Sequence, residues 1–243
     1  YLLYQTLIGT WPESGDDRNV YRDRVRQYMI KAVREAKVHT SWVAVNDQYE
    51  HAVTSFVDDI LADGENLFIE DLRQQQNYFQ WFGLLNSVTL AIVKLTSPGV
   101  PDFYQGNELL DFSLVDPDNR RPIDYPLRRR LLADLEALAQ RPSQQIEEAL
   151  PSMFAAADGR AKLWVVRCLL DSRRRHRALY QRGDYRPLKV SGARAGNVVA
   201  YMRRFDRQGL LVVAGHLFTQ LGRPVGTLPV GVDAWGDTTV DTA

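Results

Sequence analysis

The side chains best suited to chemistry are concentrated in one stretch of the sequence, between residues 102 and 124. This stretch holds carboxylates, amides, guanidinium groups and a tyrosine, namely Asp102, Tyr104, Gln105, Asn107, Glu108, Asp111, Asp116, Asp118, Asn119, Arg120, Arg121 and Asp124. Planar carboxylate, amide and guanidinium groups form paired hydrogen bonds with hydroxyl groups, and aromatic rings cover the apolar faces of sugars. The composition therefore predicts a sugar-binding loop. A loop held only by internal Arg–Asp pairs needs the same residue types, so the pattern leaves both interpretations open.

The rest of the chain lacks the common motifs of catalysis and cofactor binding. It has no glycine-rich phosphate loop, no Cys/His spacing for a metal and no Gly-x-Ser-x-Gly nucleophile motif. Its four histidines do not lie near one another, and its single cysteine, Cys168, has apolar neighbours that predict a position in the core. We therefore expect neither a metal nor a cofactor.

Charge and hydropathy argue against two classes of partner. The 30 Lys and Arg residues balance 30 Asp and Glu residues, whereas nucleic-acid-binding proteins carry a positive field. The longest apolar run, Leu84–Leu95, contains polar residues and is shorter than the ~20 residues of a membrane-spanning helix. The basic run Arg173–Arg177 is interpreted as a helix C-terminus, which favours cations, and a polyanion site there is the weaker alternative. We expect no nucleic acid, no membrane and a cytoplasmic location.

The spacing of apolar residues predicts the elements that position the polar stretch. It predicts amphipathic helices over 21–38 and 49–61, and one or two buried helices over 66–96. Basic residues between the apolar positions of the first helix are interpreted as a solvated face: Arg22, Arg24, Arg26, Lys31 and Arg34. Residues 100–108 are typical of a buried strand that opens into the polar loop, with Asp102 as a buried hydrogen-bonding residue.

The C-terminal part of the sequence changes from helical to β-rich patterns. A helix is predicted from Pro126 and another over about 160–176. Short β-rich runs separated by glycine and polar turns then predict an antiparallel sheet: 184–190, 197–205 and 209–215. We place a domain boundary near residue 180, between a helix-rich part with at least one buried strand (1–180) and a small β-domain (181–243).

Two motifs of the polar stretch resemble the maltooligosyl trehalose synthase family of the α-amylase superfamily. They are Val100-Pro-Asp-Phe-Tyr-Gln-Gly-Asn-Glu108 and Asp111-Phe-Ser-Leu-Val-Asp-Pro-Asp-Asn-Arg-Arg-Pro-Ile-Asp124. Shorter matches are spread over nearly the whole chain and become sparse after residue 190: Tyr1–Pro12, Ala36–Trp42, Lys94–Gly99, Gly183–Leu188 and Trp235–Thr238. The resemblance implies an α/β fold, namely the C-terminal part of a (β/α)8 barrel with its eighth strand at about 101–104, followed by a small antiparallel β-domain. In such barrels the loops after the strands carry the site.

The resemblance implies an isomerase of trehalose biosynthesis. Members of the family convert the reducing-end α-1,4 linkage of maltooligosaccharides into an α,α-1,1 linkage, through a retaining mechanism that uses a carboxylate nucleophile and a carboxylic acid. In the superfamily these groups lie on earlier barrel strands, and a third aspartate directly follows a histidine. No histidine of this chain is followed by Asp. We therefore expect a C-terminal fragment that holds no catalytic carboxylate and is inactive alone; its partners would be the maltooligosaccharide and the missing N-terminal barrel portion.

The same resemblance assigns residues that position the substrate. Tyr104, Gln105 and Glu108 would line or support the sugar pocket at the mouth of strand eight. The loop that forms a wall of this sugar pocket would contain Asp116, Asp118, Asn119, Arg120 and Arg121. Which of these residues contacts sugar and which only braces the loop stays open, and Arg121 and Asp124 could equally form a structural pair. The alternative function is that of a non-catalytic α-glucan-binding module.

Overall fold

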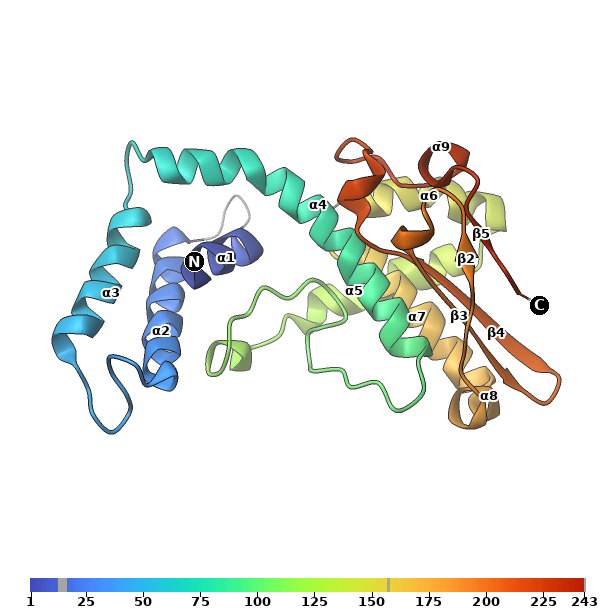
Figure 1. The fold of residues 1–243 in the computed structure, drawn as a ribbon, viewed down its shortest axis with the longest axis horizontal. Coiled ribbons are helices and arrows are strands. Elements are labelled where there is room, and N and C mark those ends of the chain that lie inside the picture. The colour runs from blue at the N-terminus through green and yellow to red at the C-terminus, as the bar shows by residue number, and fades with distance from the viewer. Residues whose placement is uncertain (13–16, 157, 243) are drawn as a thin grey trace. The chain divides into compact units, whose positions relative to one another are not determined.

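The computed structural model describes residues 1–12, 17–156 and 158–242 (Figure 1). The chain groups into two compact units. Unit 1 comprises Tyr1–Phe79 and Phe112–Pro122, and unit 2 comprises Gln80–Asp111 and Ile123–Ala243. The polar stretch found in the sequence is therefore divided between the units, and its two parts have different structural surroundings.

Unit 1 is helical. It contains α1 (Leu2–Thr10), α2 (Arg18–Ala36), α3 (Asp47–Ile60), the first part of α4 (Leu67–Thr96) and the short 3-10 helix η1 (Asp118–Arg120). Helices α2 and α3 confirm the two amphipathic helices predicted from apolar spacing. Each begins after a side chain that accepts free N–H groups of the first turn, Asp17 for α2 and Asn46 for α3.

The core of unit 1 forms between its helices and the segment 112–122. Leu7, Val25 and Val57 have no exposed surface and lie at its centre. Leu114 packs into the same core, although it is far from these residues in sequence. Its burial explains why the second half of the polar stretch belongs to unit 1 and not to the unit that contains its sequence neighbours.

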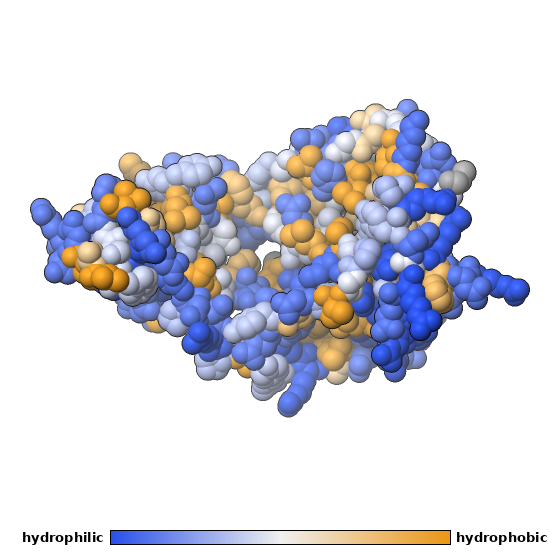
Figure 2. Space-filling view, turned by 60° about the horizontal axis from the view of Figure 1, so that its bottom comes forward, coloured by the Kyte–Doolittle hydropathy of each residue, from blue (hydrophilic) through white to orange (hydrophobic). Residues whose placement is uncertain are grey.

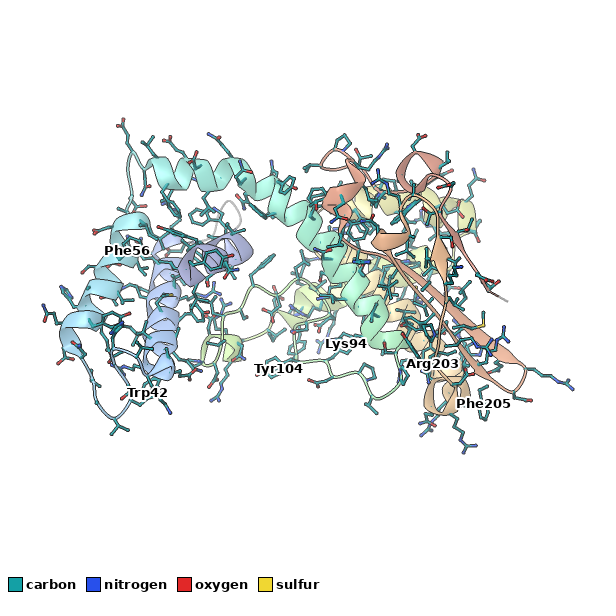
Figure 3. All side chains as sticks on the ribbon, viewed as in Figure 1. Trp42, Phe56, Lys94, Tyr104, Arg203 and Phe205 are labelled. Carbon is teal, nitrogen blue, oxygen red and sulfur yellow. The ribbon has the colours of Figure 1, made fainter. Side chains whose placement is uncertain are left out.

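A buried carboxylate organises the connection between α2 and α3. Glu50 is 8% exposed and accepts hydrogen bonds from Arg34 (Nε–Oε1 2.8 Å) and from the hydroxyl of Thr40 (2.6 Å). The guanidinium and the hydroxyl lower the pKa of Glu50 to about 2. The ring of Trp42, on this connection, lies 4.9 Å from the Arg34 guanidinium and is 55% exposed (Figure 3).

Unit 2 combines helices with small antiparallel sheets. Its helices are the second part of α4, α5 (Tyr125–Ala139), α6 (Ser143–Ala155), α7 (Arg160–Arg175), α8 (Arg177–Arg182) and α9 (Val232–Trp235). The predicted helix start at Pro126 is confirmed, because Asp124 caps α5 by accepting the N–H of Leu127 (2.8 Å). Helices α5, α6 and α7 pack on one another around a core that includes Leu131, Leu135 and Leu109.

The sheets confirm the β-rich C-terminal part. Strands β1 (Arg186–Pro187), β3 (Val198–Phe205) and β4 (Gln208–Gly215) form an antiparallel sheet in the order β1-β3-β4, and β2 (Val190–Ser191) pairs with β5 (Thr239–Val240). The long pair runs from Val198 opposite Gly215 to Phe205 opposite Gln208. The remaining short elements are the 3-10 helices η2 (Ala195–Asn197) and η3 (Phe218–Leu221).

One predicted element is wrong: residues 101–104 do not form the expected eighth barrel strand. Residues 97–117 contain neither helix nor strand. A barrel strand needs hydrogen-bonded neighbours, and all strands in the described part of the chain pair within the C-terminal sheets. Asp102, predicted to be buried on that strand, is exposed. The fold is otherwise compatible with part of a barrel followed by a small β-domain, and a boundary near residue 180 stays a prediction.

Several large apolar side chains lie at the surface. The exposed fraction of the residue exceeds 70% at Tyr1, Val38, Val43, Leu67, Val100 and Val232. On the face drawn in Figure 2, hydrophobic residues form separate patches within a mostly hydrophilic surface. None of the helices in the described ranges has the length and apolar character to cross a membrane.

Candidate functional site

The first half of the polar stretch, Tyr104–Asp111, is a tight turn in unit 2. The N–H of Asn107 donates to the carbonyl of Tyr104 (3.1 Å), and Gly106 has a φ of 93°. This backbone conformation favours glycine, and a Cβ atom at Gly106 would lie only 2.9 Å from Cδ1 of Ile123. The sequence Tyr-Gln-Gly-Asn-Glu can therefore make a compact turn that keeps Tyr104, Gln105 and Glu108 close in the chain.

Arg128 of α5 stabilises this turn through two contacts. Its guanidinium pairs with the carboxylate of Glu108 through Nε and donates from Nη2 to the carbonyl of Gly106 (3.0 Å). Both partners of the ion pair are partly buried. Glu108 is therefore already engaged, because a charge withdrawn from water requires a partner. The geometry favours a supporting role for this carboxylate in the turn.

Tyr104 and Gln105 are more open than Glu108. Tyr104 is 46% exposed, and Figure 3 shows it on the coil that follows α4. Gln105 is exposed, and its Oε1 accepts a hydrogen bond from the hydroxyl of Tyr125 (3.3 Å). These two side chains and Tyr125 offer an aromatic face, hydroxyl groups and an amide, which are the groups that bind sugar rings and their hydroxyls.

The second half of the stretch is built around Asp118 in unit 1. Arg24 of α2 donates to both carboxylate oxygens of Asp118 (Nε–Oδ1 2.7 Å, Nη2–Oδ2 2.8 Å), and the N–H of Leu114 donates to Oδ2 (2.6 Å). Burial raises the pKa of Asp118, but the hydrogen bonds and the charges of Arg24 and Arg121 outweigh it, so that the pKa is lowered. With its side chain 12% exposed, Asp118 holds the loop together.

Other groups of this half are more accessible. Arg120 is 70% exposed and pairs with Asp116, whose carbonyl accepts a hydrogen bond from Lys31 of α2 (2.6 Å). Arg121 pairs with Asp118 (Nε–Oδ1 3.1 Å) and is about half exposed. Arg121 therefore pairs with Asp118 and not with Asp124. The carboxylate of Asp124 instead accepts the N–H of Leu127 at the start of α5. Arg120 and Arg121 are therefore the groups of this half with donors that reach solvent.

The eight predicted site residues thus fall into two groups. The turn in unit 2 carries Tyr104, Gln105 and Glu108, and the loop in unit 1 carries Asp116, Asp118, Asn119, Arg120 and Arg121. Within each group, one carboxylate is bound by an arginine of a helix, and this ion pair stabilises the backbone conformation of the loop. The remaining groups are hydrogen-bond donors, acceptors and an aromatic ring, which suits binding and orientation of a polyhydroxylated ligand more than covalent chemistry.

Sequence reasoning missed the residues that brace both groups. Arg24, Lys31 and Arg34 were expected on a solvated face of the first helix, but Arg24 binds Asp118, Lys31 binds the carbonyl of Asp116 and Arg34 binds Glu50. The error has a physical reason: helical periodicity shows which face is polar, and it contains no information on partners outside the helix, which here lie 16 to 94 positions away. Arg128 had one local signal, since it lies in the first turn of a helix that starts beside the polar loop.

Other motifs have structural roles. Of the basic run 173–177, Arg173 donates to carbonyls at the end of α4, while Arg174 and Arg175 pair with Asp171. This engagement weakens the polyanion alternative. Cys168, predicted to lie in the core, is only partly buried, and this burial raises the pKa of its thiol. Within the described ranges, no cluster of three His, Cys, Asp or Glu side chains could hold a metal ion.

Comparison with known proteins gives consistent results, although no family model matches the chain. The chain is 35% identical over 239 residues to a protein of Mycobacterium tuberculosis (strain H37Rv) named "Putative maltooligosyl trehalose synthase", which covers 97% of this chain. Among solved structures, maltooligosyltrehalose synthase from Arthrobacter ramosus matches 99% of the chain with 32% identity and a TM-score of 0.73.

A hypothetical maltooligosyl trehalose synthase of Sulfolobus tokodaii matches 88% of the chain with 33% identity and a TM-score of 0.67. In each case the match is confined to part of the larger protein. The chain spans 27% of the length of the Mycobacterium and Arthrobacter proteins and 26% of the Sulfolobus protein. The resemblance predicted from the sequence motifs is confirmed.

Proposed function

Because the chain resembles maltooligosyl trehalose synthase along nearly its whole length, we propose that it is the C-terminal portion of such an enzyme. The full-length enzyme converts the reducing-end α-1,4 linkage of a maltooligosaccharide into an α,α-1,1 linkage. The observation that carries this proposal is the 35% identity over 97% of the chain, which leaves no large part of it unmatched. The expected cytoplasmic location stays a prediction.

In this proposal the bond-breaking carboxylates lie in the rest of the enzyme, and this chain positions the substrate. A retaining enzyme of this kind passes through a glycosyl-enzyme intermediate. The released glucose must then turn over and attack through its anomeric hydroxyl before water does. Donors such as Arg120 and Arg121 in unit 1, and separately the open ring of Tyr104 in unit 2, would contact glucose units, while carboxylates that are already paired keep the backbone of each segment rigid.

The partner of this chain in the proposal is the remaining barrel portion of the same polypeptide. The exposed apolar side chains Val38, Val43, Leu67 and Val100 support this view. Large exposed apolar surface generally marks an interaction site, and packing against further polypeptide would remove it from water. No cofactor and no metal is part of the proposed mechanism.

The test uses the full-length parent protein with maltohexaose. We expect the number of reducing ends to fall while the oligosaccharide length is kept, because an α,α-1,1 linkage leaves no reducing end. The chain of 243 residues alone should produce no such change. Unchanged reducing ends with the full-length protein would reject the proposal.

The alternative, a non-catalytic α-glucan-binding module, predicts a different result. In that case the isolated chain binds maltohexaose by titration calorimetry and the full-length protein leaves the sugar unchanged. Absence of binding by the isolated chain would reject the module and leave the enzyme proposal intact. The experiment therefore separates the two functions with the same ligand.

A further inference from the structure

The segment between α4 and α5 in unit 2 is held by cations that donate to its backbone carbonyls. Residues 97–111 have no helix or strand, so their backbone groups need partners from elsewhere in the protein. The accepting carbonyls belong to Leu95 and Thr96 at the end of α4 and to Ser97, Gly99, Asp102, Gly106 and Leu109 in the segment. The donors are Lys94, Arg128, Lys162, Arg173 and Arg203.

Arg203 is the most deeply buried of these cations. It lies on β3 and is 1% exposed. Its Nη1 donates to the carbonyls of Thr96 (3.4 Å) and Ser97 (3.5 Å), while its Nη2 and Nε donate to those of Gly183 (2.9 Å) and Asp184 (3.3 Å). In the described chain its hydrogen bonds all go to backbone carbonyls. A buried charge is costly unless each of its donors is satisfied, so these carbonyls determine where the guanidinium lies.

The carbonyls at the end of α4 suit such a partner. The last carbonyls of a helix lack intrahelical partners and carry the negative end of the helix dipole. Arg173 of α7 also donates there, to Leu95 (2.7 Å) and to Gly99 (3.1 Å). Both guanidinium groups therefore donate to carbonyls at this helix end, Arg173 to Leu95 and Arg203 to Thr96. Burial, together with the charge of Arg203, lowers the pKa of Arg173.

Lys94 holds the part of the segment that directly precedes the predicted sugar-binding turn. Lys94 donates to the carbonyl of Asp102 (2.9 Å) and lies 3.8 Å from the ring centre of Phe103. Tyr104 follows directly. Figure 3 shows Arg203 on the hairpin, Lys94 near the end of α4 and Tyr104 on the coil beyond it. The path from Thr96 to Tyr104 is thus held at its start by β3 and near its end by α4.

We propose that Arg203 is a positioning residue: through the carbonyls of Thr96 and Ser97 it sets where the segment carrying Tyr104 leaves α4. The β-rich part of unit 2 therefore contributes to substrate binding without contacting the substrate. This inference takes the identity of the substrate from the proposed function. It adds a residue that lies outside both groups of predicted site residues.

The test is Arg203→Lys in the full-length protein, because lysine keeps the charge but a single ammonium cannot reach all the carbonyls at once. We expect KM for maltohexaose to rise about fivefold, with kcat changed less than about twofold. Loss of folded protein would lower kcat and leave KM unchanged. Hydrogen exchange of amides in residues 97–109 should become about tenfold faster.

Tyr201→Phe is the matched control. Tyr201 is also on β3 and equally buried, and its hydroxyl contacts Oγ1 of Thr96 (2.5 Å). The substitution removes a contact between the same elements but leaves every carbonyl bond of Arg203. It should lower the melting temperature and leave KM unchanged.

An unchanged KM in an active Arg203→Lys enzyme would overturn the inference, whatever happens to its melting temperature. Failure of the wild-type full-length protein to isomerise maltohexaose would instead reject the proposed function. In that case unchanged exchange over 97–109 in Arg203→Lys rejects the positioning role, and faster exchange supports it.

Discussion

The two halves of the polar stretch are stabilised in opposite ways. In unit 1, segment 112–122 is organised mainly by one carboxylate, Asp118, which binds Arg24 and a backbone N–H, while Arg24 and Lys31 also donate to carbonyls of the segment. In unit 2, segment 97–111 depends on several cations that each donate to backbone carbonyls, among them Arg128 and Arg203. The first arrangement concentrates stability in one side chain and makes it titratable. The second distributes most of its stability over neutral carbonyl acceptors, in addition to the Glu108–Arg128 ion pair, so the halves should respond differently to mutation and to acid.

The largest expected effect is that of Arg24→Ala. Removing the guanidinium leaves the largely buried carboxylate of Asp118 without its main partner, which should cost about 3 kcal/mol of unfolding free energy. Urea unfolding measures this cost, and hydrogen exchange should speed up over residues 112–122. Lys162→Met, which frees only the carbonyl of Leu109, is the comparison and should cost about 1 kcal/mol or less.

If Lys162→Met were as destabilising as Arg24→Ala, the contrast between concentrated and distributed support would be wrong. Arg26→Ala is a further control on the same helix as Arg24. Arg26 is more exposed and its carboxylate partners are 3.4 and 3.5 Å away, so its loss should cost less than about 0.5 kcal/mol.

Acid should loosen unit 1 before the segment 97–111. The pKa of Glu50 is about 2 in the folded protein, whereas a glutamate without these interactions has a pKa of 4.5. The pKa of Asp118 is also lowered. A carboxyl group with a lowered folded-state pKa adds stability above its unfolded pKa, and this stability is lost as pH falls from about 4.5 toward about 2. Backbone carbonyls do not titrate in this range.

Hydrogen exchange at pH 5 and pH 3, corrected for intrinsic rates, checks this prediction. Protection around residues 37–50 and 112–122 should fall more than protection over 97–109. Glu50→Gln should remove part of the pH dependence around 37–50 and leave that of 112–122 unchanged. Equal loss of protection in all three regions would contradict the prediction.

The smallest effect on stability is expected for Arg120→Ala. Its exposed pair with Asp116 should contribute less than about 0.5 kcal/mol. In the full-length protein, however, loss of this donor should raise the share of hydrolysis over transglucosylation a few-fold, because a loosened glucose lets water compete. Quantifying glucose and the non-reducing product tests this expectation, and an unchanged product ratio would remove Arg120 from the site.

The local patterns of the sequence predicted most of the helices and strands. Spacing by three and four located α2 and α3, Pro126 located the start of α5, and the β-rich runs located β3 and β4. The same patterns failed at residues 101–104, where apolar and aromatic residues indicated a strand. Strand formation depends on a neighbouring strand, and the apolar character of a short segment does not reveal whether one is present.

The sequence alone determined which residue types the predicted sugar-binding loop offers, because composition and motif are local properties. Only the tertiary structure decided which of these groups are already occupied. Asp118 and its partner Arg24 are 94 positions apart, and Thr96 and Arg203 are 107 positions apart. Helical and strand periodicities extend over a few residues, whereas ion pairs and carbonyl contacts form wherever folding brings two surfaces together. The distinction between a bracing carboxylate and an open donor is therefore a property of packing.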